Sequence, residues 1–305
     1  RNYGTYHCRA ESADAWRLPI VVIKGRTWIH MYVEVNGTKL YYDTLGKGVG
    51  VIFLHGGLGF DHTYFRPWVD PLSEKFRVVY YDHRGNGRSD GRDSLANVDH
   101  STWTDDLDAL REYLGFDTFV LVGHSYGGIL GQEYALRYQD RLKGLVLMTT
   151  LPAWDYRDTV LANARSRGTS EQIAAAESMW TPVADADEFA ELGGKILPLY
   201  FKRYDPEIGK KMADEGYPSY QAYNRGFIEC LRGWSVVERL GEINTKTLVI
   251  AGAEDWITPV EQAERIHERL PNSELVVFEE SGHSLHIEEQ ERYLEVVGNW
   301  ITNLK

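Results

Sequence analysis

The sequence has few cysteines, no long apolar run and no excess of basic residues. Only Cys8 and Cys230 occur among 305 residues, which indicates a reduced, cytoplasmic setting and leaves too few thiolates for a cysteine-based zinc site. No apolar run approaches the roughly 20 residues that a membrane-spanning helix needs. The formal net charge of −12 is spread along the chain, which argues against nucleic acid or a membrane as a partner and favours a soluble protein.

Residues 1–30 differ in character from the rest of the chain. Their one short apolar run is broken by Pro19 and is too short and wrongly flanked for a secretory signal or an anchor. A strand is predicted over residues 31–35, and an Asn-Gly pair after it is a strong hairpin signal. We therefore predict that residues 1–30 are an N-terminal extension, with a packed strand over residues 20–23 as the alternative.

From residue 49 onward, buried strands alternate with helical stretches, which is typical of a mostly parallel, doubly wound α/β sheet. The predicted strands are residues 49–54, 77–81, 118–122, 142–148, 246–251 and 274–278, and the predicted helices are residues 102–114, 260–270 and 289–301.

The stretch between the strands at 142–148 and 246–251 is rich in proline, aromatic residues and short helical patches. We predict that residues 151–241 form a helical cap inserted after the sixth strand. Residues 31–150 and 242–305 would then form one α/β core domain.

A serine between two glycines, Ser125, lies at the turn between a predicted strand and a predicted helix. This arrangement is a nucleophile elbow, in which Gly123 and Gly127 are needed because the turn leaves no room for side chains. The hydroxyl would project clear of the backbone, and the helix N-terminus would favour negative charge beside it. A plain Gly/Ser turn is the structural alternative.

A serine hydroxyl needs a base and a group that orients the base, and in this architecture both follow later strands in the order acid, then histidine. Asp255 follows the strand at 246–251, and His283 follows the strand at 274–278. We prefer Asp255 to Glu254 because of its spacing from the preceding glycine and the following proline. We prefer His283 to His286 because Gly282 permits a tight turn.

The oxyanion formed by serine attack needs backbone N–H donors, each worth about 3–4 kcal/mol. One predicted donor is Tyr126, directly after the nucleophile. The other is Gly57, in the loop after the first parallel strand, where glycine lets the backbone approach substrate. His55 is expected to brace that loop.

Residues 82–91 are rich in glycine and arginine but lack the lysine spacing of a phosphate-binding P-loop, and no dinucleotide or His/Glu metal motif is present. Asp82 and Arg84 are therefore interpreted as charges that fix a loop. We expect neither a metal nor another cofactor.

Four motifs together make the chain similar to a known superfamily. They are His55-Gly56-Gly57-x-Gly59, Asp82-x-Arg84-Gly85-x-Gly87-Arg88-Ser89, Gly123-x-Ser125-Tyr126-Gly127-Gly128, and the two late loops that hold Asp255 and His283. From about residue 31 to its end, the chain resembles an α/β-hydrolase with an inserted cap, in the proline iminopeptidase and carboxylesterase branch. A serine at position 125 argues against the dehalogenases and epoxide hydrolases of this fold, which use aspartate there.

Two departures from the proline iminopeptidases bear on substrate. Those enzymes usually have proline where Leu58 stands and glutamine where His83 stands. They also bind the free amino terminus of the substrate through glutamates on the cap, for which Glu229, Glu191 and Glu177 are the candidates.

The preferred hypothesis is a serine hydrolase of small carboxylic esters or lactones. A proline iminopeptidase-like aminopeptidase is the alternative, and a ligand-binding homologue without catalysis is a third. The residues expected to line the substrate pocket are Leu58, Trp154, Trp180, Tyr200, Tyr220, Phe227, Glu229 and Trp234.

Overall fold

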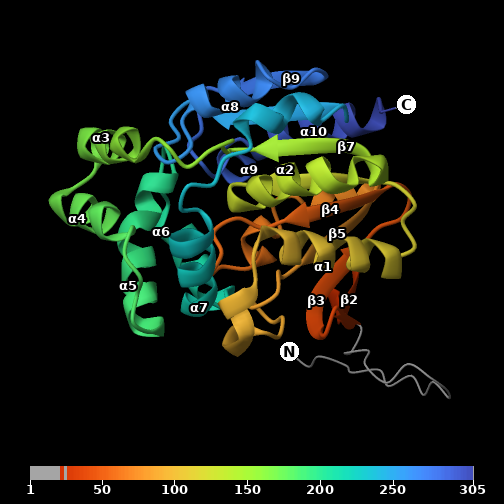
Figure 1. The fold of residues 1–305 in the computed structure, drawn as a ribbon, viewed down its shortest axis with the longest axis horizontal. Coiled ribbons are helices and arrows are strands. Elements are labelled where there is room, and N and C mark those ends of the chain that lie inside the picture. The colour runs from red at the N-terminus through yellow and green to blue at the C-terminus, as the bar shows by residue number, and fades with distance from the viewer. Residues whose placement is uncertain (1–20, 24–25, 305) are drawn as a thin grey trace.

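The structure, a computed structural model, describes residues 21–23 and 26–304, with side chains from residue 31 onward. Within these residues, nine strands form one sheet in the order β1-β2-β3-β5-β4-β6-β7-β8-β9 (Figure 1). The strands are β1 (Val21–Ile23), β2 (Arg26–Val35), β3 (Thr38–Leu45), β4 (Gly50–Leu54), β5 (Arg77–Tyr81), β6 (Phe119–His124), β7 (Leu142–Met148), β8 (Thr247–Gly252) and β9 (Ser273–Phe278).

The sheet is mostly parallel, as the alternation of strands and helices predicts. Strands β5, β4, β6, β7, β8 and β9 run parallel to one another, and β1, β2 and β3 add an antiparallel edge. The β2–β3 hairpin turns at Asn36 and Gly37, whose φ angles of 45° and 72° suit a type I′ turn.

The N-terminal boundary of regular structure differs from the prediction. Strand β2 begins at Arg26 and not at residue 31, because its first residues pair with β1 while the rest pairs with β3. Strand β1 falls close to the alternative of a strand over residues 20–23. Residues 1–20, including Cys8, lie outside the described part of the chain.

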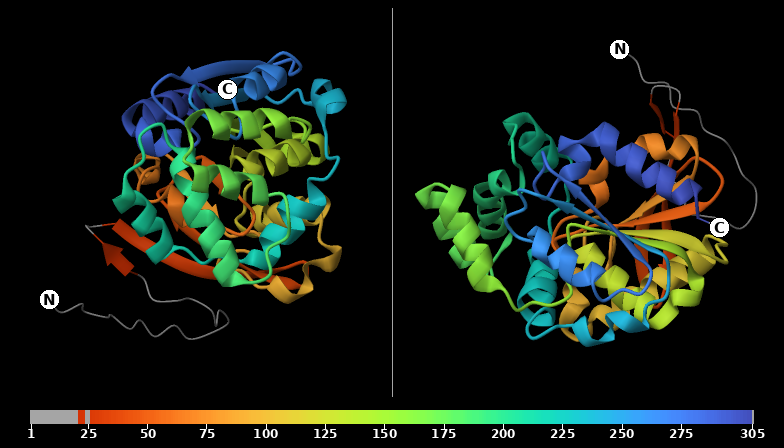
Figure 2. Two further views of the ribbon diagram at one scale, coloured as in Figure 1. Left: turned by 90° about the vertical axis from the view of Figure 1, so that its left-hand side faces the viewer. Right: turned by 90° about the horizontal axis from the view of Figure 1, so that it is seen from above.

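Helices cover both faces of the sheet (Figure 2). The core helices are α1 (His100–Tyr113), α2 (Tyr126–Tyr138), α8 (Val260–His267), α9 (Leu285–Glu288) and α10 (Gln290–Thr302), with short 3₁₀ turns η1 (His62–Phe65), η2 (Asp70–Glu74), η3 (Arg92–Asn97), η4 (Gln139–Arg141) and η7 (Val237–Glu242). Because alternate strand residues point to opposite faces, Ile52 and Leu54 join the apolar cluster under α1 and α2, whereas Val51 and Phe53 join the one under α10.

The predicted cap region is helical and follows β7, the sixth strand when the count starts at β2. It contains α3 (Arg157–Arg167), α4 (Ser170–Ser178), α5 (Ala186–Ile196), η5 (Leu197–Tyr200), α6 (Pro206–Glu215), α7 (Tyr220–Tyr223) and the π-helix η6 (Asn224–Cys230). Figure 1 shows these helices beyond one end of the parallel strands. The turn that holds Ser125 follows β6 at this same end, and residues of the predicted cap line a cavity together with Ser125.

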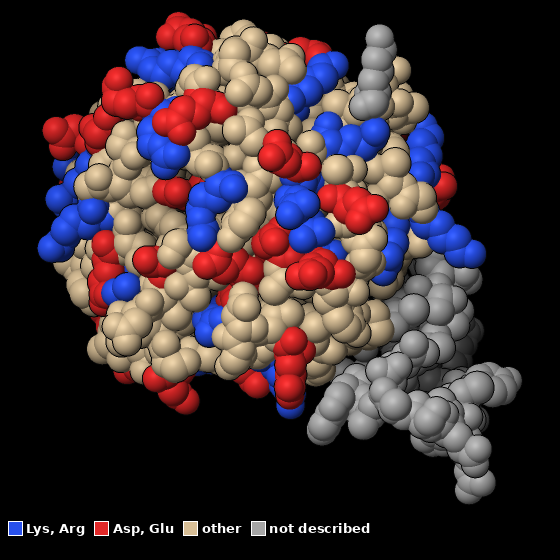
Figure 3. All heavy atoms as spheres, turned by 45° about the vertical axis from the view of Figure 1, so that its right-hand side comes forward, with Lys and Arg blue, Asp and Glu red and all other residues tan. Residues whose placement is uncertain are grey.

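Acidic and basic side chains alternate over the face of the molecule drawn in Figure 3. No helix among the described residues combines the length and apolar character of a bilayer span.

Candidate active site

Ser125 occupies a strained turn between β6 and α2, with φ 55° and ψ −119°. The two flanking glycines are required by space as well as by the turn. A Cβ on Gly123 would lie 2.4 Å from the carbonyl oxygen of Gly127, and one on Gly127 would lie 2.2 Å from that of Leu54. The Ser125 amide is fixed by a 2.9 Å hydrogen bond to Met148 O in β7. This is the geometry of a nucleophile elbow.

The loop after β4 lies against the elbow. A Cβ on Gly56 would come within 2.7 Å of Ser125 Cβ, so only glycine allows this approach. The Gly56 amide donates to Tyr64 Oη at 2.6 Å. Within the described part of the chain, the amides of Gly57 and Tyr126 donate no hydrogen bond. Both residues line the same cavity as Ser125, so their N–H groups are available to an oxyanion.

Asp255 and His283 form a buried pair at the ends of β8 and β9. His283 Nδ1 lies 2.7 Å from Asp255 Oδ2, and Asp255 Oδ1 accepts from the amides of Ile257 and Thr258 at 2.9 and 3.0 Å. The Thr258 hydroxyl donates to Asp255 Oδ2 at 2.6 Å. Because Nδ1 of His283 is bonded to the carboxylate, Nε2 is the ring nitrogen that can accept a proton from a serine hydroxyl or a substrate. His283 and Ser125 line one cavity.

The cap contacts the histidine loop directly. The Tyr200 carbonyl, at the end of η5, accepts from the amides of His283 and Ser284 at 2.8 and 3.3 Å. A Cβ on Gly282 would lie 2.8 Å from that same carbonyl oxygen. Glycine at 282 therefore lets the cap and the histidine loop touch.

His55 connects two loops beside the site. Its Nε2 accepts from the His83 amide at 3.2 Å, and its Nδ1 lies 3.0 Å from Gly56 O. Burial lowers the pKa of His55, so the ring is neutral and Nδ1–H donates to the carbonyl. This position agrees with the bracing role expected of it.

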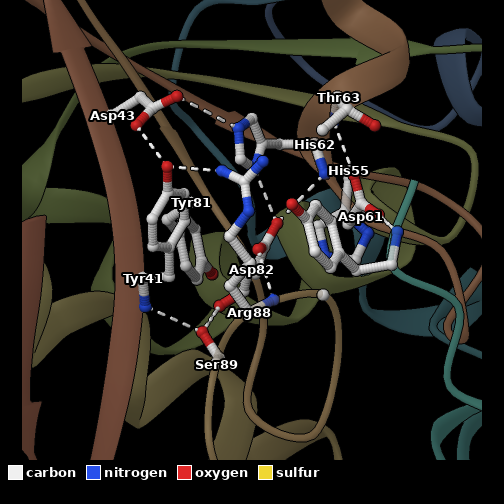
Figure 4. A network of polar contacts seen from close by, with 12 residues as sticks. Tyr41, Asp43, His55, Asp61, His62, Thr63, Tyr81, Asp82, Arg88 and Ser89 are labelled. Carbon is white, nitrogen blue, oxygen red and sulfur yellow. Dashed lines mark hydrogen bonds and ion pairs between the residues drawn. The ribbon is translucent and has the colours of Figure 1, made fainter. Parts of the chain in front are cut away.

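A buried network of charges holds the loops at 55–65 and 82–91 (Figure 4). Asp82 Oδ1 lies 2.6 Å from His62 Nδ1, and Asp82 Oδ2 accepts from the Arg88 amide at 2.8 Å. His62 Nε2 lies 3.4 Å from Asp43. Arg84 pairs instead with Asp106 at 2.7 Å, so the two charges of the motif anchor the loop separately.

The network sets the protonation of its members. Burial acts to lower the pKa of His62, but Asp82 and Asp43 outweigh it and raise that pKa to about 9. Burial acts to raise the pKa of Asp82, whereas His62 holds it below its ordinary value. His62 is therefore an imidazolium between two carboxylates.

Asp61, His62 and Asp82 are the group in the described chain with ligand atoms close enough to hold a metal ion, within 4.8 Å of one another. Their bonding capacity is already used. His62 Nδ1 carries a proton toward Asp82, while Asp61 accepts from the amides of Thr63 and Tyr217. A cation would have to displace these contacts.

A cavity of about 490 Å³ lies in front of Ser125, between the core and the cap. Leu58, Trp154, Tyr200 and Phe227 line it, as expected from the sequence. Leu58 packs so tightly on the π-helix η6 that a Cβ on Gly226 would lie 2.2 Å from Leu58 Cδ1.

The structure does not bring the other predicted pocket residues to this cavity. Trp180 borders a second cavity of about 520 Å³, which shares Trp154 and Phe227 with the first. Tyr220 and Trp234 border neither cavity in the described chain, and both pack against the apolar cluster that the core and the cap share.

The three cap glutamates proposed to bind an amino terminus also lie away from the cavity in front of Ser125. Glu229 is half exposed and pairs with Arg225, because the side chains are four residues apart on the outer side of η6. Glu177 pairs with Arg165 and Glu191 with Lys195. Among the described residues, the acidic side chain that lines the cavity is Asp61, in the core.

Sequence reasoning misses three polar residues of the site. Thr258 directly follows Ile257, whose amide closes an Asx turn on the Asp255 side chain, and this local spacing could have identified it. His124 directly precedes Ser125, but its contacts with Tyr64 and His283 join distant segments, for which the sequence offers no local pattern.

Comparison with known proteins agrees with this geometry. The family model described as alpha/beta hydrolase fold matches residues 50–290. A proline iminopeptidase of Saccharolobus solfataricus is 31% identical over 294 residues, which cover 88% of this chain and 91% of that protein. A proline iminopeptidase of Clostridioides difficile is 30% identical over 289 residues, covering 88% and 97%.

Solved structures show the same fold. An esterase of Thermogutta terrifontis superposes with a TM-score of 0.72 at 24% identity, covering 92% of this chain and 98% of that one. A proline iminopeptidase of Mycobacterium smegmatis gives a TM-score of 0.74 at 20% identity, covering 90% and 97%. The chain belongs to the α/β hydrolase fold family, in the branch of proline iminopeptidases and esterases. It is a hydrolase.

Proposed function

We propose that the protein is a serine hydrolase of small carboxylic esters. Ser125 is the nucleophile, His283 the general base and Asp255 the group that orients it. The amides of Gly57 and Tyr126 receive the oxyanion. The 2.7 Å contact between His283 Nδ1 and Asp255 supports these roles, since it fixes the tautomer that exposes Nε2.

The reaction has two stages. Ser125 Oγ bonds to the carbonyl carbon while its proton passes to His283 Nε2, and negative charge on the carbonyl oxygen meets the two amides. The ester C–O bond then breaks, and His283 returns the proton to the departing alcohol. Water attacks the acyl-enzyme by the same route and releases the acid, which restores Ser125.

The nature of the cavity favours an ester over an amino-terminal peptide. Aromatic and aliphatic side chains from the core and cap form most of its wall. Its carboxylate, Asp61, already accepts two backbone N–H groups. A substrate with a free ammonium group would lose hydration there and gain little in return.

A proline iminopeptidase activity is the second candidate. Relatives with that name are about 30% identical to this chain, and the similarity extends over nearly their whole length. It would use the same serine, histidine and aspartate. The difference lies in the leaving group and in recognition of the amine.

The test compares wild type and Ser125→Ala on p-nitrophenyl butyrate and on proline p-nitroanilide, together with labelling by a fluorophosphonate. We expect ester turnover and labelling by wild type, and a loss of about 10³-fold or more in Ser125→Ala. Amide turnover that exceeds ester turnover and disappears on N-acetylation of the substrate would establish the aminopeptidase. If wild type shows no labelling and no turnover of either substrate, the protein would be a binding protein without catalysis.

A further inference from the structure

His124, the last residue of β6, lies beside the nucleophile, yet no step of the proposed reaction uses it. Its ring is buried, and both ring nitrogens form hydrogen bonds. Nε2 lies 3.1 Å from the main-chain carbonyl of His283, and Nδ1 lies 2.7 Å from the Tyr64 hydroxyl. The two partners come from separate segments of the chain, the loop that holds His283 and η1.

The chemistry of the partners fixes each proton. A carbonyl oxygen can only accept, so Nε2 carries the hydrogen. Burial, together with the neighbouring His283 and His286, lowers the pKa of His124 well below its ordinary value, so the ring is neutral and Nδ1 accepts. Burial also raises the pKa of Tyr64, which keeps its hydroxyl protonated and able to donate.

The Tyr64 oxygen is at the same time an acceptor, since the Gly56 amide donates to it at 2.6 Å. The bonds therefore form one directed chain from Gly56 N–H through Tyr64 and His124 to the carbonyl of His283. One end adjoins Gly57, the proposed oxyanion donor, and the other end is the main-chain carbonyl of His283, whose side chain is the proposed base.

We propose that Tyr64 and His124 are positioning residues that hold the oxyanion loop and the base loop at a fixed separation across Ser125. This rests on the proposed function, but the hydrogen-bond chain exists without it. With Gly56 N–H held by Tyr64, the next amide, Gly57 N–H, is left for the substrate oxygen. Displacing reacting groups by about 1 Å costs on the order of 100-fold in rate.

Burial is the largest cause of the lowered pKa of His124. The neighbouring rings of His283, His286 and His55 lower it further, and the hydrogen bond to the His283 carbonyl acts in the opposite direction. The His286 ring centre lies 5.4 Å from that of His124, and both of its nitrogens are buried without a partner in the described part of the chain. Burial and the surrounding imidazoles therefore make the neutral ring of His124 the stable form.

The experiment removes the Tyr64 hydroxyl and compares Tyr64→Phe with Tyr293→Phe. Tyr293 is a matched control, because it is fully buried and its hydroxyl has no partner in the described structure. On p-nitrophenyl butyrate, with active sites titrated by fluorophosphonate, we expect kcat of Tyr64→Phe to fall about 10- to 100-fold with KM within about twofold. Tyr293→Phe should stay within about twofold of wild type.

A second pair separates hydrogen bonding from packing at position 124. The glutamine amide offers one acceptor and one donor, so His124→Gln should keep several times more activity than His124→Leu. Equal losses in both variants, a Tyr64→Phe effect matched by Tyr293→Phe, or an effect confined to KM would overturn the positioning role.

A nitrogen-15 spectrum of the histidine rings tests the chain without any substrate. We expect His124 as a neutral ring protonated at Nε2 from pH 5 to 8, and a changed Nδ1 signal in Tyr64→Phe. Protonation at Nδ1 would overturn the proposal even in an active enzyme. A wild type that shows the expected tautomer but neither labels nor turns over would instead overturn the proposed function.

Discussion

His283 Nδ1 and Asp255 Oδ2 lie 2.7 Å apart, and both side chains are almost wholly withdrawn from solvent, with 3% and 0% exposed. Two backbone amides and the Thr258 hydroxyl complete the shell around the carboxylate. Asp255 is therefore held rigidly, and through it the imidazole.

Replacing Asp255 by asparagine should lower kcat by about 10³-fold or more, because the amide can stabilise the wrong tautomer of His283. The measurement is steady-state hydrolysis of p-nitrophenyl butyrate. Glu254→Gln is the control, since that neighbouring carboxylate is half exposed and lies 3.8 Å from Lys202. If Glu254→Gln lost more of its kcat than Asp255→Asn, Asp255 would not be the residue that orients His283.

The parallel sheet and the elbow can be predicted from sequence because both leave local patterns. Each buried parallel strand contains a continuous apolar run, such as residues 145–148 in β7, and the glycines around Ser125 mark a turn without space for side chains. The start of β2 at Arg26 cannot be predicted, because pairing with β1 decides it and pairing depends on a distant segment. Local spacing favours Asp255 over Glu254, and the structure pairs Asp255 with His283.

The cap is harder to predict in detail. Aromatic residues there serve both the core and the cavity, and composition does not distinguish the two uses, so Trp180 and Trp234 lie outside the cavity in front of Ser125. The charge of Glu229 makes it a candidate for binding an amino terminus, but its carboxylate forms an ion pair with Arg225, one helical turn away. The contacts of Tyr64 and His124 join segments about 60 residues apart, which no local pattern records.

Two glycine substitutions should move the free energy of unfolding in opposite directions. Gly127→Ala places a methyl group 2.2 Å from Leu54 O, and it should destabilise the fold by about 3 kcal/mol or more. Gly194→Ala, in α5, meets nothing within 4 Å, and it should stabilise by up to about 1 kcal/mol because alanine favours helix. Urea unfolding measures both. Equal effects would show that space at the elbow is not limiting.

The stability contributed by His62 should disappear at alkaline pH. Its pKa rises from an ordinary 6.5 to about 9 on folding, so its contribution is complete below pH 6.5 and is lost as pH rises to about 9. Such a shift corresponds to about 3 kcal/mol. Asp82 does not confound this window, since its depressed pKa matters only in acid.

The measurement for His62 is urea unfolding of wild type and His62→Gln between pH 6 and 9.5. We expect the difference in free energy of unfolding between the two proteins to shrink as pH rises. A difference that stays constant across this range would mean that His62 is not charged in the fold.

Glu229→Gln should leave turnover of both p-nitrophenyl butyrate and proline p-nitroanilide within about twofold of wild type. The carboxylate pairs with Arg225 on the outer side of η6 and does not line the cavity, and an exposed ion pair of this kind contributes less than about 1 kcal/mol. Glu177→Gln, whose carboxylate pairs with Arg165 on α3, serves as the control. A selective loss of amide turnover in Glu229→Gln would mean that the cap moves this carboxylate inward to bind an amino terminus. In that case the aminopeptidase would replace the esterase as the better account, because an ester substrate without an amine has no use for that charge.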